Sequence, residues 1–214
     1  VASTGAQAYG GSDVALSANG RYVAFSSASA TLVAGDTNNQ SDLFLHDRQT
    51  KQTVRISLGP GAVQANGASA FPSLSADGRF VAFQSTATNL AVGDNNNVSD
   101  IYLWDRTTGK TLCASCAGNG NSQTPSLSDD GRRVAFTSLA GNLTPGDNNG
   151  VSDIFLYDFS NATLRRISVS SGGTQANGPS EAPDLSSDGR FIAFSSAASN
   201  LVAGDVNGYP DIFL

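Results

Sequence analysis

Methionine is absent from the 214 residues, and glutamate, histidine and tryptophan occur once each. Because the chain begins at Val1 and has no methionine, we expect that a signal segment was removed or that the chain is a piece of a longer protein. No apolar run approaches the roughly 18 residues of a membrane span, and no window of useful length has the 3.6-residue apolar period of a helix. These absences predict a chain with no membrane span and little helix.

Positive charge is scarce as well, because lysine occurs only at Lys51 and Lys110 and the formal net charge is −6. A nucleic-acid-binding protein needs a basic surface to neutralise phosphates, so we expect no nucleic-acid partner. The abundant residues are Gly, Ser, Ala, Asn, Thr and Asp, which favour strands and turns over helices.

Two phrases occur four times each, and both recur at offsets of 58, 53 and 58 residues. Leu-Ser-x-(Asp/Asn)-Gly-Arg-x-(Val/Ile)-Ala-Phe begins at Leu16, Leu74, Leu127 and Leu185. Gly-Asp-x-Asn-x-x-x-Asp-(Leu/Ile)-(Phe/Tyr)-Leu begins at Gly35, Gly93, Gly146 and Gly204. A fixed period of this size indicates one structural unit stacked repeatedly. With no linker between copies, we predict a single array over residues 1–214, with repeats at 1–57, 58–115, 116–168 and 169–214.

The second repeat predicts four short strands, at 69–75, 79–85, 101–105 and 110–115. The third of these is apolar on both faces and must be covered on both sides. Four-stranded antiparallel sheets, each packed between its neighbours, are the blades of an all-β propeller, whose last blade is incomplete here. A β-helix, with shorter repeats and parallel pairing, is the less favoured alternative. Prolines in the first strand predict an edge strand that lines the central channel: Pro72, Pro125 and Pro183.

The segments Leu-Ser-Ala-Asp-Gly-Arg-Phe-Val-Ala-Phe at 74–83, Ser-Asp-Ile-Tyr-Leu-Trp-Asp at 99–105 and Thr-Thr-Gly-Lys at 107–110 resemble the TolB-like, WD40-like propeller repeat. All four copies share the resemblance, which implies a propeller of the secreted bacterial type but assigns no function. The chain departs from the family where Ala, Asp or Ser replaces the usual Pro of the turn. Its loop before the third strand is also longer and carries a recurring leucine: Leu32, Leu90, Leu143 and Leu201.

That longer loop repeats Asp-x-Asn followed by Asp four positions on, and it holds eight of the 18 acidic residues. Three hard oxygen side chains in one short turn suit Ca²⁺, which takes about six to eight oxygen ligands. Alternatively, Asp and Asn only cap the turn by bonding to its backbone, since the loop is shorter than an EF-hand and lacks its final Glu. The candidate calcium ligands are Asp36, Asn38, Asp42, Asp94, Asn96, Asp100, Asp147, Asn149, Asp153, Asp205, Asn207 and Asp211.

Catalytic groups are few, and the only histidine, His46, occupies the position of Trp104 and Tyr157 in other copies. That equivalence marks it as an aromatic packing position, and no Gly-x-Ser-x-Gly elbow accompanies it. The aspartates after the third strand are interpreted as hairpin-turn residues: Asp47, Asp105 and Asp158. The arginines of the first phrase are expected to pair with nearby carboxylates or to lie along the blade surface, with a recurring anion site as a less favoured alternative: Arg21, Arg79, Arg132 and Arg190. We therefore predict that the chain by itself is not an enzyme.

The two cysteines, Cys113 and Cys116, lie where the fourth strand of the second repeat runs into a Gly/Asn/Ser loop. A redox-active pair needs a helix N-terminus to lower a thiol pKa, and a zinc site needs two further ligands that the neighbouring sequence does not offer. A local disulfide and two free thiols remain as alternatives.

Two functional classes remain for an extracellular or periplasmic chain of this kind. One is a structural or interaction scaffold, with calcium as a stabiliser; the other is a module that binds a carbohydrate or a protein, with Tyr9 and Tyr209 as the main aromatic candidates. A third alternative is an accessory propeller of a larger hydrolase.

The last copy ends inside its predicted third strand at Leu214, while Val1 aligns with Val169, so a strand and a turn are missing between the two ends. Three explanations remain: a fragment of a larger propeller, a four-bladed ring with one three-stranded blade, or self-association through the unpaired edge strand.

Overall fold

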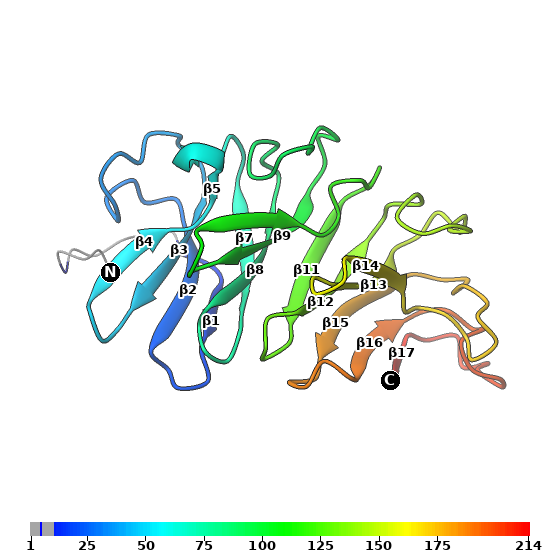
Figure 1. The fold of residues 1–214 in the computed structure, drawn as a ribbon. Helices are drawn as coiled ribbons and strands as arrows, with labels where there is room; N and C mark the ends of the chain where they lie inside the picture. The colour runs from blue at the N-terminus through cyan, green and yellow to red at the C-terminus, as the bar shows by residue number, and fades with distance from the viewer. Residues whose placement is uncertain (1–4, 6–10) are drawn as a thin grey trace.

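The computed structural model describes residue 5 and residues 11–214, and there the protein consists almost entirely of strands and turns (Figure 1). Four antiparallel sheets, called sheets 1 to 4 in chain order, stand side by side, and each falls within one sequence repeat. Sheets 1 to 3 have four strands and sheet 4 has three. The predicted all-β propeller of four-stranded blades, with an incomplete last blade, is confirmed. None of the helices in the described residues is long and apolar enough to cross a membrane.

The strands of the sheets have the following bounds. Sheet 1 contains β1 (Val14–Leu16), β2 (Tyr22–Ser27), β3 (Asp42–Asp47) and β4 (Gln52–Arg55). Sheet 2 contains β7 (Ser69–Leu74), β8 (Phe80–Ser85), β9 (Asp100–Asp105) and β10 (Lys110–Cys113). Sheet 3 contains β11 (Ser122–Leu127), β12 (Arg133–Ser138), β13 (Asp153–Asp158) and β14 (Thr163–Arg166). Sheet 4 contains β15 (Ser180–Leu185), β16 (Ile192–Ser196) and β17 (Asp211–Phe213). A small hairpin, β5 (Leu58–Gly59) and β6 (Val63–Gln64), flanks the 3₁₀ turn η1 (Pro60–Ala62).

Apolar side chains from facing sheets form one core layer at each junction. Between sheets 1 and 2, Leu43 and Leu45 join a cluster with Phe83 and Tyr102. Similar clusters lie between sheets 2 and 3 and between sheets 3 and 4. The third strand of sheets 2 and 3 contributes to the layers on both sides, so its residues are buried on both faces. In sheet 1, the second face of β3 is covered within its own repeat, where Phe44 packs against Leu32 and Phe25.

The prolines lie in the first strand of sheets 2, 3 and 4, and that strand is the edge of its sheet. A cavity of about 440 Å³ is lined by Pro72, Pro125 and Pro183 together with Asp13 and Phe71. These two observations confirm the prediction that the prolines lie in an edge strand that lines the centre of the array. An edge strand accommodates proline because it tolerates a missing backbone N–H.

Candidate functional site

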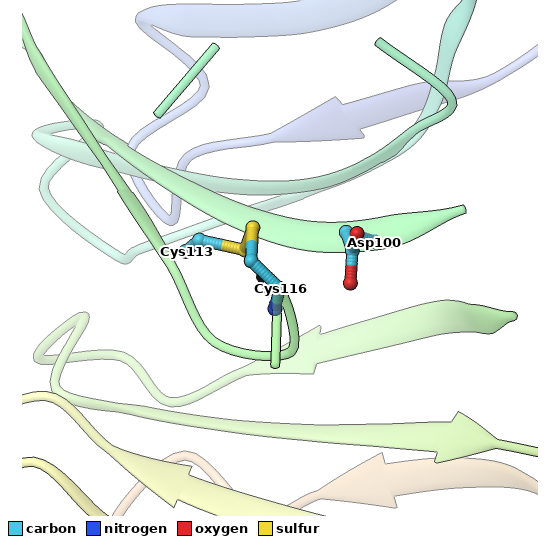
Figure 2. Close-up of side chains that lie close together, drawn as sticks. All are labelled: Asp100, Cys113 and Cys116. Carbon is cyan, nitrogen blue, oxygen red and sulfur yellow. Dashed lines mark hydrogen bonds between the residues drawn. A yellow bond between two sulfur atoms is a disulfide. The ribbon is translucent and has the colours of Figure 1, made fainter. Parts of the chain in front are cut away.

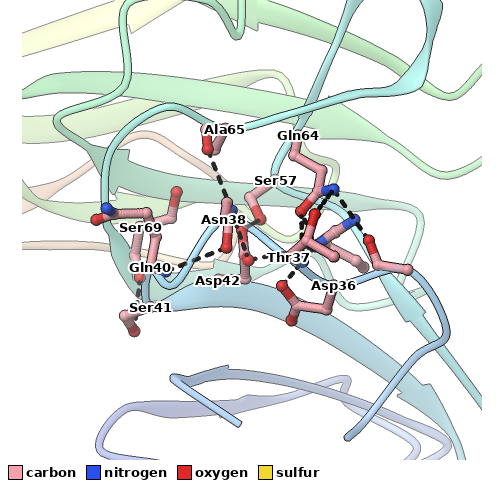
Figure 3. Close-up of polar contacts among 12 residues, drawn as sticks. Asp36, Thr37, Asn38, Gln40, Ser41, Asp42, Ser57, Gln64, Ala65 and Ser69 are labelled. Carbon is pink, nitrogen blue, oxygen red and sulfur yellow. Dashed lines mark hydrogen bonds and ion pairs between the residues drawn. The ribbon is translucent and has the colours of Figure 1, made fainter. Parts of the chain in front are cut away.

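The acidic loop of sheet 1 is tied together by its own side chains (Figure 3). Asp42, at the start of β3, is fully buried. Its Oδ1 accepts a hydrogen bond from Ser57 Oγ at 2.5 Å, and its Oδ2 accepts one from Asn38 Nδ2 at 2.9 Å. Asn38 also donates to the carbonyl of Ala65 at 3.1 Å and accepts from the backbone N–H of Gln40 at 3.1 Å. These bonds therefore close the loop on itself and tie it to the segments at Ser57 and Ala65.

An arginine from the outer strand supplies the positive charge of this loop. Arg55 Nη1 lies 3.0 Å from Asp36 Oδ1 and 3.4 Å from Asp42 Oδ2, and it donates to Gln64 Oε1 at 3.0 Å. Burial raises the pKa of Asp42, while the bonds from Ser57 and Asn38 and the charge of Arg55 lower it. The buried guanidinium thus offsets one of the two negative charges of the buried carboxylates.

The loop of sheet 3 repeats this arrangement. Asp153 accepts from Ser168 Oγ at 2.5 Å and from Asn149 Nδ2 at 2.9 Å. Arg166 Nη1 lies 3.1 Å from Asp147 Oδ1, 3.9 Å from Asp153 Oδ2 and 2.9 Å from Gln175 Oε1. Burial raises the pKa of Asp147.

The loop of sheet 2 keeps the aspartates but not the arginine. Asp100 accepts from Ser115 Oγ at 2.6 Å and from Asn96 Nδ2 at 2.9 Å. Cys113 occupies the register position of Arg55 and Arg166, opposite Tyr102 rather than a phenylalanine. The Tyr102 hydroxyl donates to Asp94 Oδ2 and also lies 2.9 Å from the carbonyl of Ala87. Burial raises the pKa of Tyr102 and of Asp100.

In the fourth loop, Asn207 Nδ2 donates to Asp211 Oδ2 at 3.0 Å, and Asn207 Oδ1 accepts from the N–H of Tyr209 at 2.8 Å. Asp205 is half-buried. The Asn–Asp contact therefore occurs in all four loops, as the turn interpretation expects, and calcium at these loops stays a prediction.

Cys113 and Cys116 form a disulfide (Figure 2), which decides between the two alternatives of the sequence. The carboxylate of Asp100 and both sulfur atoms lie within 4.8 Å of one another. The sequence did not indicate this neighbour because Asp100 is on β9, and only the β9–β10 register brings it to the disulfide. A closed disulfide has no thiolates, so the group is not a thiolate metal site in this form.

The remaining polar candidates pair within their own sheets. His46 Nδ1 lies 2.8 Å from Thr53 Oγ1 on the neighbouring strand, and burial lowers the pKa of His46. Arg21 pairs with Asp47 at 2.7 Å and Arg79 with Asp105 at 2.9 Å, as predicted.

In sheet 3, a different arginine pairs with the last aspartate of the third strand. Asp158 pairs with Arg133 at 2.9 Å rather than with Arg132. Arg133 lies directly opposite Asp158 in the register between β12 and β13. Arg132 and Arg190 approach only Asp130 and Asp188, at 3.8 and 4.0 Å, in exposed pairs. The aspartates after the third strand also accept turn N–H groups, as Asp105 does from Thr107 at 2.9 Å.

A groove of about 1330 Å³, called the outer groove, lies among the described residues. Its walls come from β4, β5, β9, β10 and sheet 3: Val54, Leu58, Trp104, Leu112, Tyr157 and Leu164. Val54 and Leu112 are exposed in it, whereas Trp104 is largely buried. Of the aromatic candidates for ligand binding, Tyr209 is exposed and Tyr9 lies outside the described residues.

No family model and no curated protein matches this sequence. Solved structures do match. TolB from Acinetobacter baumannii shares 22% identity over 89% of this chain and 38% of its own, with a TM-score of 0.55. A putative TolB from Agrobacterium tumefaciens shares 20% over 88% of this chain and 55% of its own, with a TM-score of 0.58. Oligogalacturonate lyase from Vibrio parahaemolyticus shares 13% over 94% of this chain and 50% of its own, with a TM-score of 0.54.

These likenesses show the fold alone. The chain spans about two fifths to just over half of the length of these three proteins. They include TolB proteins as well as a lyase, so fold similarity leaves the activity of this chain undecided.

Proposed function

We propose that this chain, whose fold is that of the TolB-like β-propellers, is a secreted, non-catalytic scaffold that binds a protein partner in its outer groove. The observation that carries the proposal is the groove itself, which has a volume of about 1330 Å³. Val54 and Leu112 in its wall present apolar side chains to solvent. Exposed apolar surface of this kind on a soluble domain marks an interaction site.

The polar groups support a non-catalytic role. A catalytic base or nucleophile must be free to exchange a proton with its substrate. Here Asp47, Asp105 and Asp158 are held by arginines, and His46 is bonded to a threonine on the neighbouring strand. The Cys113–Cys116 disulfide supports an extracellular or periplasmic location, because such bonds persist in oxidising compartments.

Photo-crosslinking from the groove tests this function. A benzophenone amino acid at Val54 should capture one defined protein from the secreted or periplasmic fraction, and Leu112→Asp in the same chain should weaken capture at least tenfold, the effect of losing an apolar anchor worth about 1.4 kcal/mol. Val206→Asp is the matched control, because Val206 is exposed and does not line the groove. Capture that ignores Leu112→Asp, or hydrolysis of a peptide or glycan by the purified chain, would refute the proposal.

An accessory role beside a catalytic domain is the second candidate. This chain covers 15% of the tricorn protease and 26% of a prolyl endopeptidase, with TM-scores of 0.53 each, so regions with this fold occur within larger proteolytic enzymes. Sequencing the complete gene would decide it, since a hydrolase domain in the same reading frame is required. A carbohydrate-binding role would instead appear as sugar-specific signals on a glycan array that Tyr209→Ala removes.

A further inference from the structure

The second acidic loop has the carboxylates of its neighbours without their cation. In loops 1 and 3 the aspartate pair is accompanied by Arg55 or Arg166. In loop 2, Cys113 takes the arginine position, and Ala117 stands two residues before the Asn-Gly pair, where the other copies have Gln64 and Gln175. No arginine or lysine among the described residues forms an ion pair with Asp94 or Asp100.

The carboxylates themselves are as buried as those of the other loops. Asp100 is fully buried and Asp94 is 8% exposed. Among the described residues, Asp94 Oδ1 has no hydrogen-bond partner. The counterparts of Asp94, Asp36 and Asp147, each place one carboxylate oxygen on a guanidinium, at 3.0 and 3.1 Å. A buried anionic oxygen without a partner is costly, so a cation beside this atom would be stabilising.

The guanidinium of loop 3 shows which oxygens converge on the cation position. Arg166 contacts Asp147, Asp153, Gln175 Oε1 and, at 3.4 Å, the carbonyl of Gly146. The counterparts that remain in loop 2 are the carboxylates of Asp94 and Asp100 and the carbonyl of Gly93. The outer groove is lined by Gly93, Cys113 and Ala117, so solvent reaches the side of the loop from which the arginine enters in the other copies.

Tyr102 does not replace the missing charge. Its hydroxyl carries one proton, and two acceptors lie beside it, Asp94 Oδ2 and the carbonyl of Ala87. A neutral donor leaves the two carboxylates at a formal charge of −2, whereas each arginine-containing loop has −1.

We propose that a calcium ion binds between Asp94 and Asp100 in the second loop, at the position that a guanidinium occupies in the first and third. Carboxylate and carbonyl oxygens are the ligands that Ca²⁺ prefers, and water completes its shell from the outer groove. The disulfide form offers no thiolate, which disfavours softer metals. The inference is independent of the scaffold function and concerns the second of the four loops in the calcium prediction.

Calcium titration of the chelator-treated, disulfide-bonded chain tests the site. At about 100-fold excess over Kd, calcium should raise Tm by roughly 5–10 °C for a chain of this size. Terbium, a luminescent calcium analogue, should bind the same site and be excited through the adjacent Tyr102, and calcium should displace it. Asp94→Asn should abolish both signals.

Two matched variants keep the test decisive. Asp36→Asn makes the same change in loop 1, so it should lower the basal Tm but keep the calcium-induced rise. Cys113→Arg with Cys116→Ser rebuilds the guanidinium in loop 2 and should remove the calcium response, even if Asp94→Asn fails to fold. An unchanged Tm on calcium addition to the native chain, or an equal rise in either loop-2 variant, would overturn the proposal. The first of these outcomes would assign the neutralising charge to a proton on the aspartates.

Discussion

Gly78 closes the hairpin between β7 and β8 with a φ of +68°, and a Cβ atom there would lie 2.2 Å from the ring of Tyr22 in the preceding sheet. Gly109, between β9 and β10, has nearly the same φ, +67°, but open space around its missing Cβ. The two glycines therefore separate two physical reasons for the same residue, backbone conformation and close packing between sheets.

Gly109→Ala should cost about 1–2 kcal/mol of unfolding free energy, because an L-residue is strained in the left-handed region. Gly78→Ala should cost a further 1–3 kcal/mol or so, because the added methyl group overpacks the contact with Tyr22. Urea unfolding of both variants measures the difference. Equal losses would show that the Tyr22 contact adds nothing.

The Arg79–Asp105 pair makes the free energy of unfolding depend on pH. Its hydrogen bonds lower the pKa of Asp105 from 3.8 to about 2. A depressed carboxyl pKa stabilises the fold above pH 3.8, and that contribution is lost as pH falls from about 4 to 2. Buried Asp42, whose pKa is raised, acts in the opposite direction. Arg79→Gln should therefore lower Tm at pH 6 and bring it close to that of the wild type at pH 2. A constant Tm difference across this range would contradict the assignment.

At the scale of the element, the acidic loop and the outer strand form one unit through a buried arginine. The side chain of Arg166 is 11% exposed and faces Asp147 and Asp153, while its neighbour Arg165 points to solvent. Removing one partner of a buried ion pair leaves uncompensated charge and costs about 3–5 kcal/mol, whereas an exposed arginine contributes within about 0.5 kcal/mol.

Arg166→Leu should consequently destabilise the protein by several kcal/mol in the range of about 3–5, and Arg165→Leu should leave it nearly unchanged. Thermal or denaturant unfolding measures the stability lost in each variant. The two substitutions are matched because both replace an arginine of β14 by leucine. If Arg165→Leu proved as damaging as Arg166→Leu, the ion pairs would not account for the loop.

Much of this element follows from sequence, and the exceptions have a common cause. Short apolar segments, the Asp-Gly turn and the proline indicate the strands of sheet 2 to within a residue or two, because these signals are local. The pairing of Asp42 with Arg55, and the approach of Asp100 to Cys113, depend on the register between strands three and four. Arg55 lies outside both repeated phrases and differs in the second copy, so repetition alone did not identify it as a partner.

Across the whole molecule, the four sheets follow one another in chain order, and each junction packs one face of a sheet against one face of the next. The second residue of the third strand is fully buried in sheets 2 and 3, where it is Ile101 and Ile154. Its counterpart in sheet 4, Ile212, is 76% exposed. Phe191 and Leu214, next to the ends of strands of the same sheet, are exposed as well. In sheet 1, Leu16 is exposed, whereas its counterparts Leu127 and Leu185 are buried. Both end sheets thus present apolar residues of the kind that a neighbouring sheet covers elsewhere.

Apolar faces with this complementarity should associate, so the 214-residue chain should form dimers or longer head-to-tail assemblies as its concentration rises. Light scattering after size-exclusion chromatography measures the mass across a concentration series. Ile212→Asp should shift the distribution toward monomer, because a charge cannot be buried against Leu16 or its neighbours without a partner. Val206→Asp, which alters an exposed valine in the preceding loop, should leave association unchanged. A monomeric wild-type chain at all concentrations, or equal effects of the two substitutions, would exclude these faces as an association surface.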